Sequence, residues 1–122
     1  MSVQVIDFSR DAGLLEQRRL ADLPGRVLAG DPHHSAATLF DNASGDFTAG
    51  IWTSTPGKWH AFTDRDEFCY IVSGHVQLIA EDGCTQTFKT GDAFLIPNGF
   101  RGYWVVVETT TKYYVIRHYL AG

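Results

Sequence analysis

The sequence contains two stretches that are especially informative about the fold, Glu67-Phe-Cys-Tyr-Ile-Val-Ser-Gly74 and Gly91-Asp-Ala-Phe-Leu-Ile-Pro97-Asn-Gly99. Both are short runs of β-branched and aromatic residues that end at glycine or proline turns. Runs of this kind cover 48–54, 58–63, 67–72, 75–80, 85–88, 93–96, 102–107 and 112–119. Since no helical segment separates them, the spacing predicts an all-β fold with antiparallel sheets closed into a barrel or a jelly roll.

Polar and glycine-containing segments separate these runs. Four of them are Ser73-Gly74, Glu81-Asp82-Gly83, Thr90-Gly91-Asp92 and Pro97-Asn98-Gly99. Glycine supplies the positive φ that tight hairpins need, so we expect a turn at each. Two further clusters, 30–35 and 41–46, are predicted to be loops.

The first part of the chain predicts one short helix on the outside of the domain. Leucines at 14, 15, 20 and 23 are interspersed with charged residues, and Pro24-Gly25 would end the segment 11–23. No repeat or linker divides the 122 residues. We therefore predict a single domain over 1–122, with helix, loops and arm in 1–46 and the barrel core in 47–119.

Composition restricts the partners. The formal net charge is −4, so there is no basic surplus for a nucleic acid or an anionic membrane surface. No segment approaches the roughly 20 apolar residues that span a bilayer, and no basic stretch leads into an apolar run. We expect a cytoplasmic protein in which Cys69 and Cys84 are buried free thiols.

The two informative stretches resemble the two motifs of the cupin family. Their residue sequences are most similar to those of the small ureidoglycine aminohydrolase-like cupins. Further counterparts of that family's motifs lie at Gly50-Ile-Trp52, Gly57-Lys-Trp59 and Trp104-Val-Val-Val-Glu108. The resemblance covers about residues 47–117. It implies a double-stranded β-helix, the jelly-roll cupin barrel, with Glu67 pointing into its interior.

The resemblance also implies a metal site of two histidines in an H-x-H pair, a glutamate and a third histidine. This donor set suits Mn, Fe, Ni or Zn. Counting along the motifs places the four positions at His60, Phe62, Glu67 and Gly102. Only His60 and Glu67 could donate, and two ligands leave a divalent ion mostly coordinated by water. We therefore expect no cofactor.

Strand alternation predicts which side chains face the interior. If Glu67 points inward, so do Cys69 and Ile71, while Phe68 and Tyr70 face outward. The same counting assigns His60 and Phe62 to the interior face of their strand, and Trp59 and Ala61 to the other. The predicted pocket is lined by Trp52, His60, Phe62, Glu67, Cys69 and Trp104.

The buried carboxylate needs a partner. A carboxylate inside an apolar barrel is costly unless a cation or hydrogen-bond donors meet it. One alternative is an amine-bearing ligand, to which the aromatic walls add cation–π attraction. The other is an internal ion pair of Glu67 with Arg101, Lys112 or Arg117, in a core that binds nothing.

Three functions fit these residues. The first is an enzyme acting on a small polar nitrogen-containing metabolite, with Glu67 and His60 as acid–base groups. The second is a binding module that holds a small molecule without chemistry. The third is an accessory subunit, expected to be a homodimer, that associates through Tyr113, Tyr114, Ile116 and Tyr119. A metal-dependent ureidoglycine aminohydrolase-like hydrolase is a further alternative, but it needs ligands that this chain does not supply.

Overall fold

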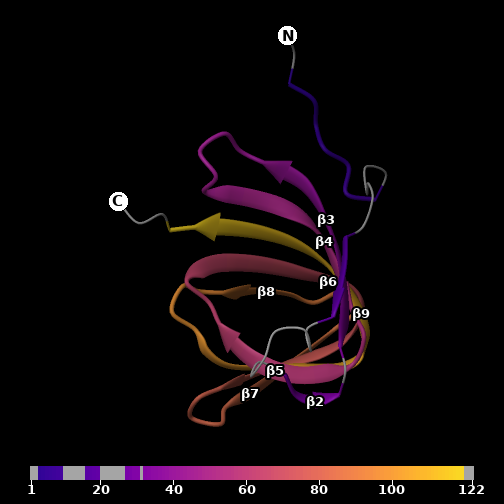
Figure 1. The fold of residues 1–122 in the computed structure, drawn as a ribbon, viewed down its shortest axis with the longest axis vertical. Coiled ribbons are helices and arrows are strands. Elements are labelled where there is room, and N and C mark those ends of the chain that lie inside the picture. Colours follow the sequence, from indigo (N-terminus) through magenta and orange to yellow (C-terminus); the bar gives the residue numbers. More distant parts are fainter. Residues whose placement is uncertain (1–2, 10–15, 20–26, 31, 120–122) are drawn as a thin grey trace.

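The computed structural model describes residues 3–9, 16–19, 27–30 and 32–119. The described part of the chain is all β, as predicted, and rolls into a barrel (Figure 1). Its strands are β1 (Glu16–Arg19), β2 (Val27–Gly30), β3 (His33–Asp41), β4 (Phe47–Ser54), β5 (Gly57–Phe62), β6 (Arg65–Ala80), β7 (Thr85–Lys89), β8 (Ala93–Ile96) and β9 (Arg101–His118). The described residues include no helix that could span a bilayer.

Two long strands build the barrel, because β6 and β9 each belong to both of its sheets. One edge of β9 pairs with β5 through residues 101–106 and with β4 through residues 110–117. The other edge pairs with β6, which in turn pairs with β8 and β7. One sheet therefore has the order β1-β3-β4-β9-β6-β8, and the other has the order β2-β5-β9-β6-β7. All pairs are antiparallel, which is the jelly-roll arrangement that the sequence predicts.

The strand β6 passes from one sheet to the other at a corner. Its pairing with β9 is irregular between Ile71 and Val76, and such bulges bend a strand. Gly74 adopts a φ of +123°, and a Cβ there would lie 2.2 Å from Thr110 Oγ1. Only glycine fits this position. The predicted hairpin at Ser73-Gly74 is therefore wrong, because the glycine marks a corner within one continuous strand.

The other turn predictions divide in two. Gly83, Gly91 and Gly99 adopt positive φ in the connections that follow β6, β7 and β8, as predicted. The loop expected over 30–35 is wrong in its second half, because His33-His34-Ser35 begins β3 and pairs with both β1 and β4. Backbone hydrogen bonds on both edges favour the extended form there over the local turn signals.

The helix predicted over 11–23 is absent from the described part of that range. Glu16–Arg19 forms β1, with Glu16 opposite Ala36 and Arg19 opposite His33. Pairing along the edge of β3 gives the backbone of these residues hydrogen-bond partners on one side. Leucine spacing alone does not make a helix. The remainder of 11–23 lies outside the described residues.

The core lies between the two sheets and follows strand alternation. Cys69 and Ile71 are fully buried, whereas Phe68 and Tyr70 are exposed, as predicted. Cys69 and Cys84 are both free thiols, but Cys84 is exposed rather than buried. The buried apolar cluster consists of Trp59, Ala61, Ile71, Val76, Leu78, Ile96, Trp104 and Val106.

Candidate functional site

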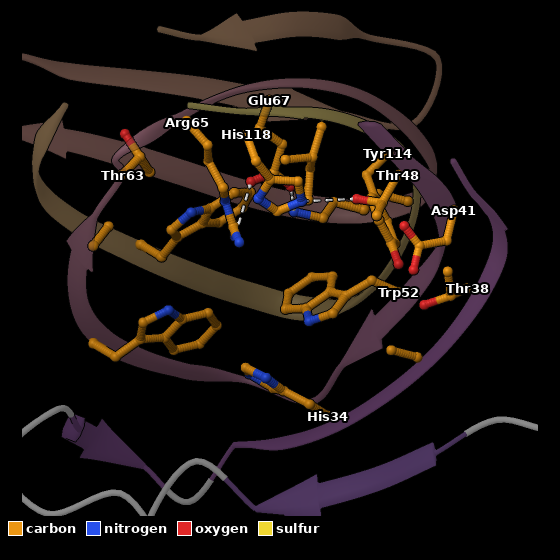
Figure 2. A pocket seen from close by; sticks show the side chains of 16 residues that line it. His34, Thr38, Asp41, Thr48, Trp52, Thr63, Arg65, Glu67, Tyr114 and His118 are labelled. Carbon is orange, nitrogen blue, oxygen red and sulfur yellow. Dashed lines mark hydrogen bonds and ion pairs between the residues drawn. The ribbon is translucent and has the colours of Figure 1, made fainter. Parts of the chain in front are cut away.

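A cavity of about 460 Å³ lies inside the barrel and is lined by β3, β4, β5, β6 and β9 (Figure 2). Its size lies in the range of small-molecule sites. Exposed Thr38 and Asp41 lie at its rim, whereas Trp59 and Trp104 are buried in its wall. The cavity therefore combines a polar entrance with an aromatic interior.

An ion pair between Glu67 and Lys112 is the electrostatic centre of this cavity. Lys112 Nζ donates to Glu67 Oε2 across 2.7 Å, and both side chains are almost completely buried. Glu67 comes from β6 and Lys112 from the neighbouring strand β9. Of the two alternatives that the sequence left open for the carboxylate, the structure contains the internal partner, and that partner is Lys112.

The ammonium group of Lys112 is also held by two tryptophans. Its Nζ lies 4.5 Å from the ring centroid of Trp52 and 4.4 Å from that of Trp104. The electron-rich faces of these rings attract a cation. Lys112 thus occupies the place between carboxylate and aromatic faces that the sequence-based interpretation assigned to the ammonium group of a ligand.

Two further groups contact the Glu67 carboxylate. Arg65, two residues earlier on β6, brings its guanidinium to 3.6 Å from Oε1, and its side chain is 43% exposed. Cys69, two residues later, donates its Sγ–H to Oε2 at 3.5 Å. Because residues 65, 67 and 69 share one strand and one parity, they share one face.

These contacts decide the protonation states. Burial alone raises the pKa of Glu67, but the Lys112 ammonium beside it, together with Arg65 and Cys69, lowers that pKa below its usual 4.5. Burial opposes the charge of Lys112, yet the neighbouring Cys69 and Glu67 side chains raise its pKa above 10.5. Burial raises the pKa of the Cys69 thiol to about 12, with Lys112 opposing and Glu67 adding to the shift. At neutral pH the pair is ionised and the thiol is protonated.

His34 completes the aromatic wall, and sequence reasoning missed it. Its ring centroid lies 5.0 Å from both Trp52 and Trp59, and the residue is 8% exposed. The loop predicted over 30–35 concealed it. The alternation of β3, which also brings Ala36 and Thr38 to the cavity, is the signal that would have placed it there.

His60 does not line the cavity. β5 and the turn after it present Trp59, Ala61 and Thr63 to the interior, while the His60 ring packs 5.1 Å from the Tyr103 ring on the other face. The inward-facing positions continue at every second residue from Trp59 through the turn to Glu67. The prediction that His60 faces inward, and Trp59 and Ala61 outward, is therefore wrong. The structure does not bring His60 to the carboxylate side of the barrel.

The remaining predicted pocket residues divide as follows. Trp52 and Trp104 line the cavity, and Cys69 lies behind it against the Glu67 carboxylate. Phe62 ends β5, and its side chain lies outside the described residues. The alternation of β9 also corrects the predicted interface, because Tyr114 and Ile116 face the cavity.

The residues at the family's metal-ligand positions do not fit a divalent metal. With the inward face of β5 corrected, the two histidine positions before Glu67 fall on Ala61 and Thr63, and the third remains Gly102. A Cβ on Gly102 would lie 2.0 Å from the carbonyl oxygen of Ile79, so no side chain fits there. Among the described residues, no group of three or more His, Cys, Asp or Glu side chains could hold a metal ion.

Comparison with known proteins agrees with this fold. A protein of unknown function from Pseudomonas syringae pv. tomato superposes with a TM-score of 0.75 at 24% identity, over 85% of this chain and 44% of that protein. The chain thus spans less than half the length of that relative. The Clostridium difficile EutQ protein gives a TM-score of 0.64 at 18% identity, over 80% of this chain and 67% of that one.

A third solved structure and the family comparison complete the result. The putative ethanolamine utilization protein Q of Salmonella typhimurium gives a TM-score of 0.62 at 21% identity, over 69% of this chain and 68% of that one. No curated protein matches the sequence. The EutQ-like cupin domain family matches residues 42–114, more than half of the chain. The chain therefore belongs to the family of EutQ-like cupin domains.

Proposed function

We propose that this cupin is a binding module for a small polar molecule, which enters the barrel and is held without covalent chemistry. The observation that carries the proposal is the cavity of about 460 Å³ built around the Glu67–Lys112 pair. Three tryptophans line this cavity together with the charged side chains of Arg65, Glu67 and Lys112. Small-molecule sites commonly combine aromatic walls with polar groups that fix the orientation of the ligand.

The protonation states favour binding over catalysis. A general acid or base works best with a pKa near the working pH. In this cavity the pKa of Glu67 is lowered by Lys112 despite burial, and the pKa of Lys112 is raised by the neighbouring Cys69 and Glu67 despite burial. The Cys69 thiol is protonated and behind the wall, so the interior offers no activated nucleophile among these groups.

The catalytic alternative concerns a nitrogen-containing metabolite. The sequence resemblance to ureidoglycine aminohydrolase-like cupins supports nitrogen-rich candidates, and the name of the Salmonella typhimurium relative adds ethanolamine. Hydrolysis at a metal is the weaker form of this alternative, because Ala61 and Gly102 occupy ligand positions. A proton transfer by Glu67 would require a substrate that separates it from Lys112.

A thermal-shift screen tests the proposal. The panel contains amino acids, short carboxylates, ureides and ethanolamine, and each compound is also incubated with the protein and analysed by mass spectrometry. A ligand of the folded state raises Tm. Ala36→Phe fills the cavity from β3 and should abolish the shift, whereas Ala93→Phe, on an exposed position of β8, should keep it.

The outcomes separate the two functions. A raised Tm with unchanged compound supports the binding module. A product that disappears in Glu67→Gln supports the enzyme instead. Shifts of equal size in wild type and Ala36→Phe would contradict a site in the barrel cavity.

A further inference from the structure

We propose that the cavity selects a carboxylate-bearing ligand, with Arg65 as the residue that recognises the carboxylate. This inference rests on the proposed binding function and names the class of ligand. It reverses the sequence-based expectation of an amine, and the reversal follows from the charges around Glu67.

The first step is the charge balance of the buried side of the cavity. Glu67 is the buried carboxylate, and two cations contact it, Lys112 at 2.7 Å and Arg65 at 3.6 Å. Asp41, the other carboxylate that lines the cavity, is exposed at the rim. The buried Lys112 already pairs with Glu67, so the half-exposed Arg65 leaves one positive charge in excess beside this pair. An anion that enters the cavity can meet this charge.

The second step excludes an amine. A ligand ammonium would compete with Lys112 both for Glu67 Oε2 and for the faces of Trp52 and Trp104. If it did not displace Lys112, it would be a third cation around one carboxylate. Either result is unfavourable, because like charges repel most strongly where water is excluded.

The third step is the geometry of Arg65. A guanidinium carries five N–H donors in a planar fork, and its approach to Glu67 Oε1, at 3.6 Å, is longer than a hydrogen bond. Figure 2 shows the Arg65 side chain extending from β6 into the cavity, with Trp52 and His34 on the opposite wall. The fork suits a carboxylate in two-pronged contact, and a planar ligand body fits against the aromatic wall.

A single excess charge also distinguishes between anions. A carboxylate is a monoanion and balances it, whereas a phosphate monoester brings about two negative charges at neutral pH. The second of these charges would lie near Glu67. We therefore expect a carboxylate to be preferred over a phosphate ester with the same organic body.

The chain contains a built-in reporter for the test. All three of its tryptophans, Trp52, Trp59 and Trp104, line this cavity. Tryptophan fluorescence is therefore titrated with four probes that share one ring: benzoate, phenyl phosphate, benzamide and benzylammonium, at constant ionic strength. We expect benzoate to bind about tenfold more tightly than each of the others, which corresponds to about 1.4 kcal/mol. Benzoate alone forms a charge-assisted bidentate pair without bringing a second negative charge near Glu67.

Variants assign the selectivity to its residue. Arg65→Gln should weaken benzoate binding about tenfold and leave benzamide unchanged. Arg101→Gln is the matched control, because Arg101 pairs with Asp64 on the surface at 2.9 Å. Each variant is first checked for a cooperative thermal transition, and Arg65→Lys, which keeps the charge without the fork, serves if Arg65→Gln does not fold.

The inference is overturned if benzylammonium or phenyl phosphate binds more tightly than benzoate, or if benzoate binding survives in Arg65→Gln. In those cases the binding function stands, with a different ligand class or a different anchor. If none of the four probes changes the fluorescence, the carboxylate inference fails as well. The binding function fails only if the wider thermal-shift panel is also empty.

Discussion

Lys112 Nζ lies 2.7 Å from Glu67 Oε2, and the two residues are 45 positions apart in sequence. Their strands are neighbours, with Glu67 opposite Ile116 and Ile71 opposite Lys112. The pair therefore reaches diagonally across β6 and β9. Its formation requires the correct register of the two longest strands. The ion pair therefore forms only in the correctly folded barrel.

Removing the cation should be costly. Lys112→Ala leaves a buried carboxylate without its main partner, and breaking such a pair destabilises by about 3–5 kcal/mol. Urea unfolding at pH 7 measures the loss. Lys58→Ala is the control, because Lys58 lies over the Tyr103 ring on the outer face. Ethylammonium should raise the Tm of Lys112→Ala and not that of Lys58→Ala, because it replaces the missing cation. Equal stability of the two variants would contradict a structural role of Lys112.

Removing both charges should cost less than removing one. In Glu67→Gln/Lys112→Met neither partner is left as an isolated buried charge, and apolar replacement of a buried pair is often close to neutral. We expect the double variant to be at least about 1 kcal/mol more stable than each of Glu67→Gln and Lys112→Met. A double-mutant cycle from urea midpoints gives the coupling free energy. Additive losses would show that the two charges act independently.

The pair should stabilise the fold over a defined pH window. The folded-state pKa of Glu67 is held below its usual 4.5 by Lys112 despite burial, so its contribution is complete above pH 4.5 and is lost as pH falls further. The folded-state pKa of Lys112 is above 10.5, so its contribution is complete below pH 10.5 and is lost at higher pH. Asp66 has a lowered pKa as well, because Tyr119 and the Asn98 backbone donate to it.

Urea midpoints from pH 3 to pH 11 test this window. The difference between wild type and Glu67→Gln/Lys112→Met removes the contribution of Asp66 and isolates that of the pair. This difference should be constant between pH 4.5 and pH 10.5 and shift in favour of the variant outside that range. A difference that changes around pH 7 would point to a histidine instead.

The two cysteines should differ sharply in reactivity. Burial raises the pKa of Cys69 to about 12, and the thiolate is the reactive form. Cys84 is exposed in the turn after β6. Iodoacetamide at pH 8 should therefore label Cys84 alone in the native protein, and both residues in urea, as peptide mass spectrometry can show. Native labelling of Cys69 would mean that the barrel opens on the timescale of the reaction.

A homodimer remains a prediction. The outer face of β6 and β8 exposes Phe68, Tyr70 and Leu95, with Phe68 directly opposite Leu95. Exposed apolar residues in neighbouring strands are typical of association surfaces. Light scattering should give a dimer mass for wild type and a monomer mass for Phe68→Glu. Val107→Glu alters an exposed apolar residue of β9 and should leave the mass unchanged.

Much of the fold could be predicted from the sequence because strand patterns are local. The runs that became β4, β5, β7 and β8 were recognisable from β-branched and aromatic residues between turns. Gly74 could not be interpreted in this way, because a glycine in a hairpin and a glycine in a strand corner look alike. What distinguishes them is the close approach of Thr110, which is a tertiary contact.

The sequence predicts the candidate site less well than the fold, because a site depends on which face of each strand points inward. The sequence pattern predicts correctly that Glu67 and Trp104 face inward. It predicts the wrong inward face for β5, because a shift of one residue exchanges the two faces of a strand. Lys112 was deducible, since it has the same parity as Trp104, whereas Arg101 and Arg117 have the other. Arg65 was deducible in the same way, because it lies two residues before Glu67 on β6 and therefore on the same face of the strand.

The shared strand β9 also dictates how the protein must be made. At about 5–20 residues per second, Lys112 leaves the ribosome seconds after Glu67. Until then the nascent chain contains β4, β5 and β6 but lacks β9, the strand that lies between β6 and the other two. The Glu67 carboxylate is still hydrated at that stage. Neither sheet can form before β9 is present, because β9 lies between β6 and the strands β4 and β5. Folding of this barrel therefore waits for the synthesis of β9, and its interior cavity forms in the same step as its stable fold.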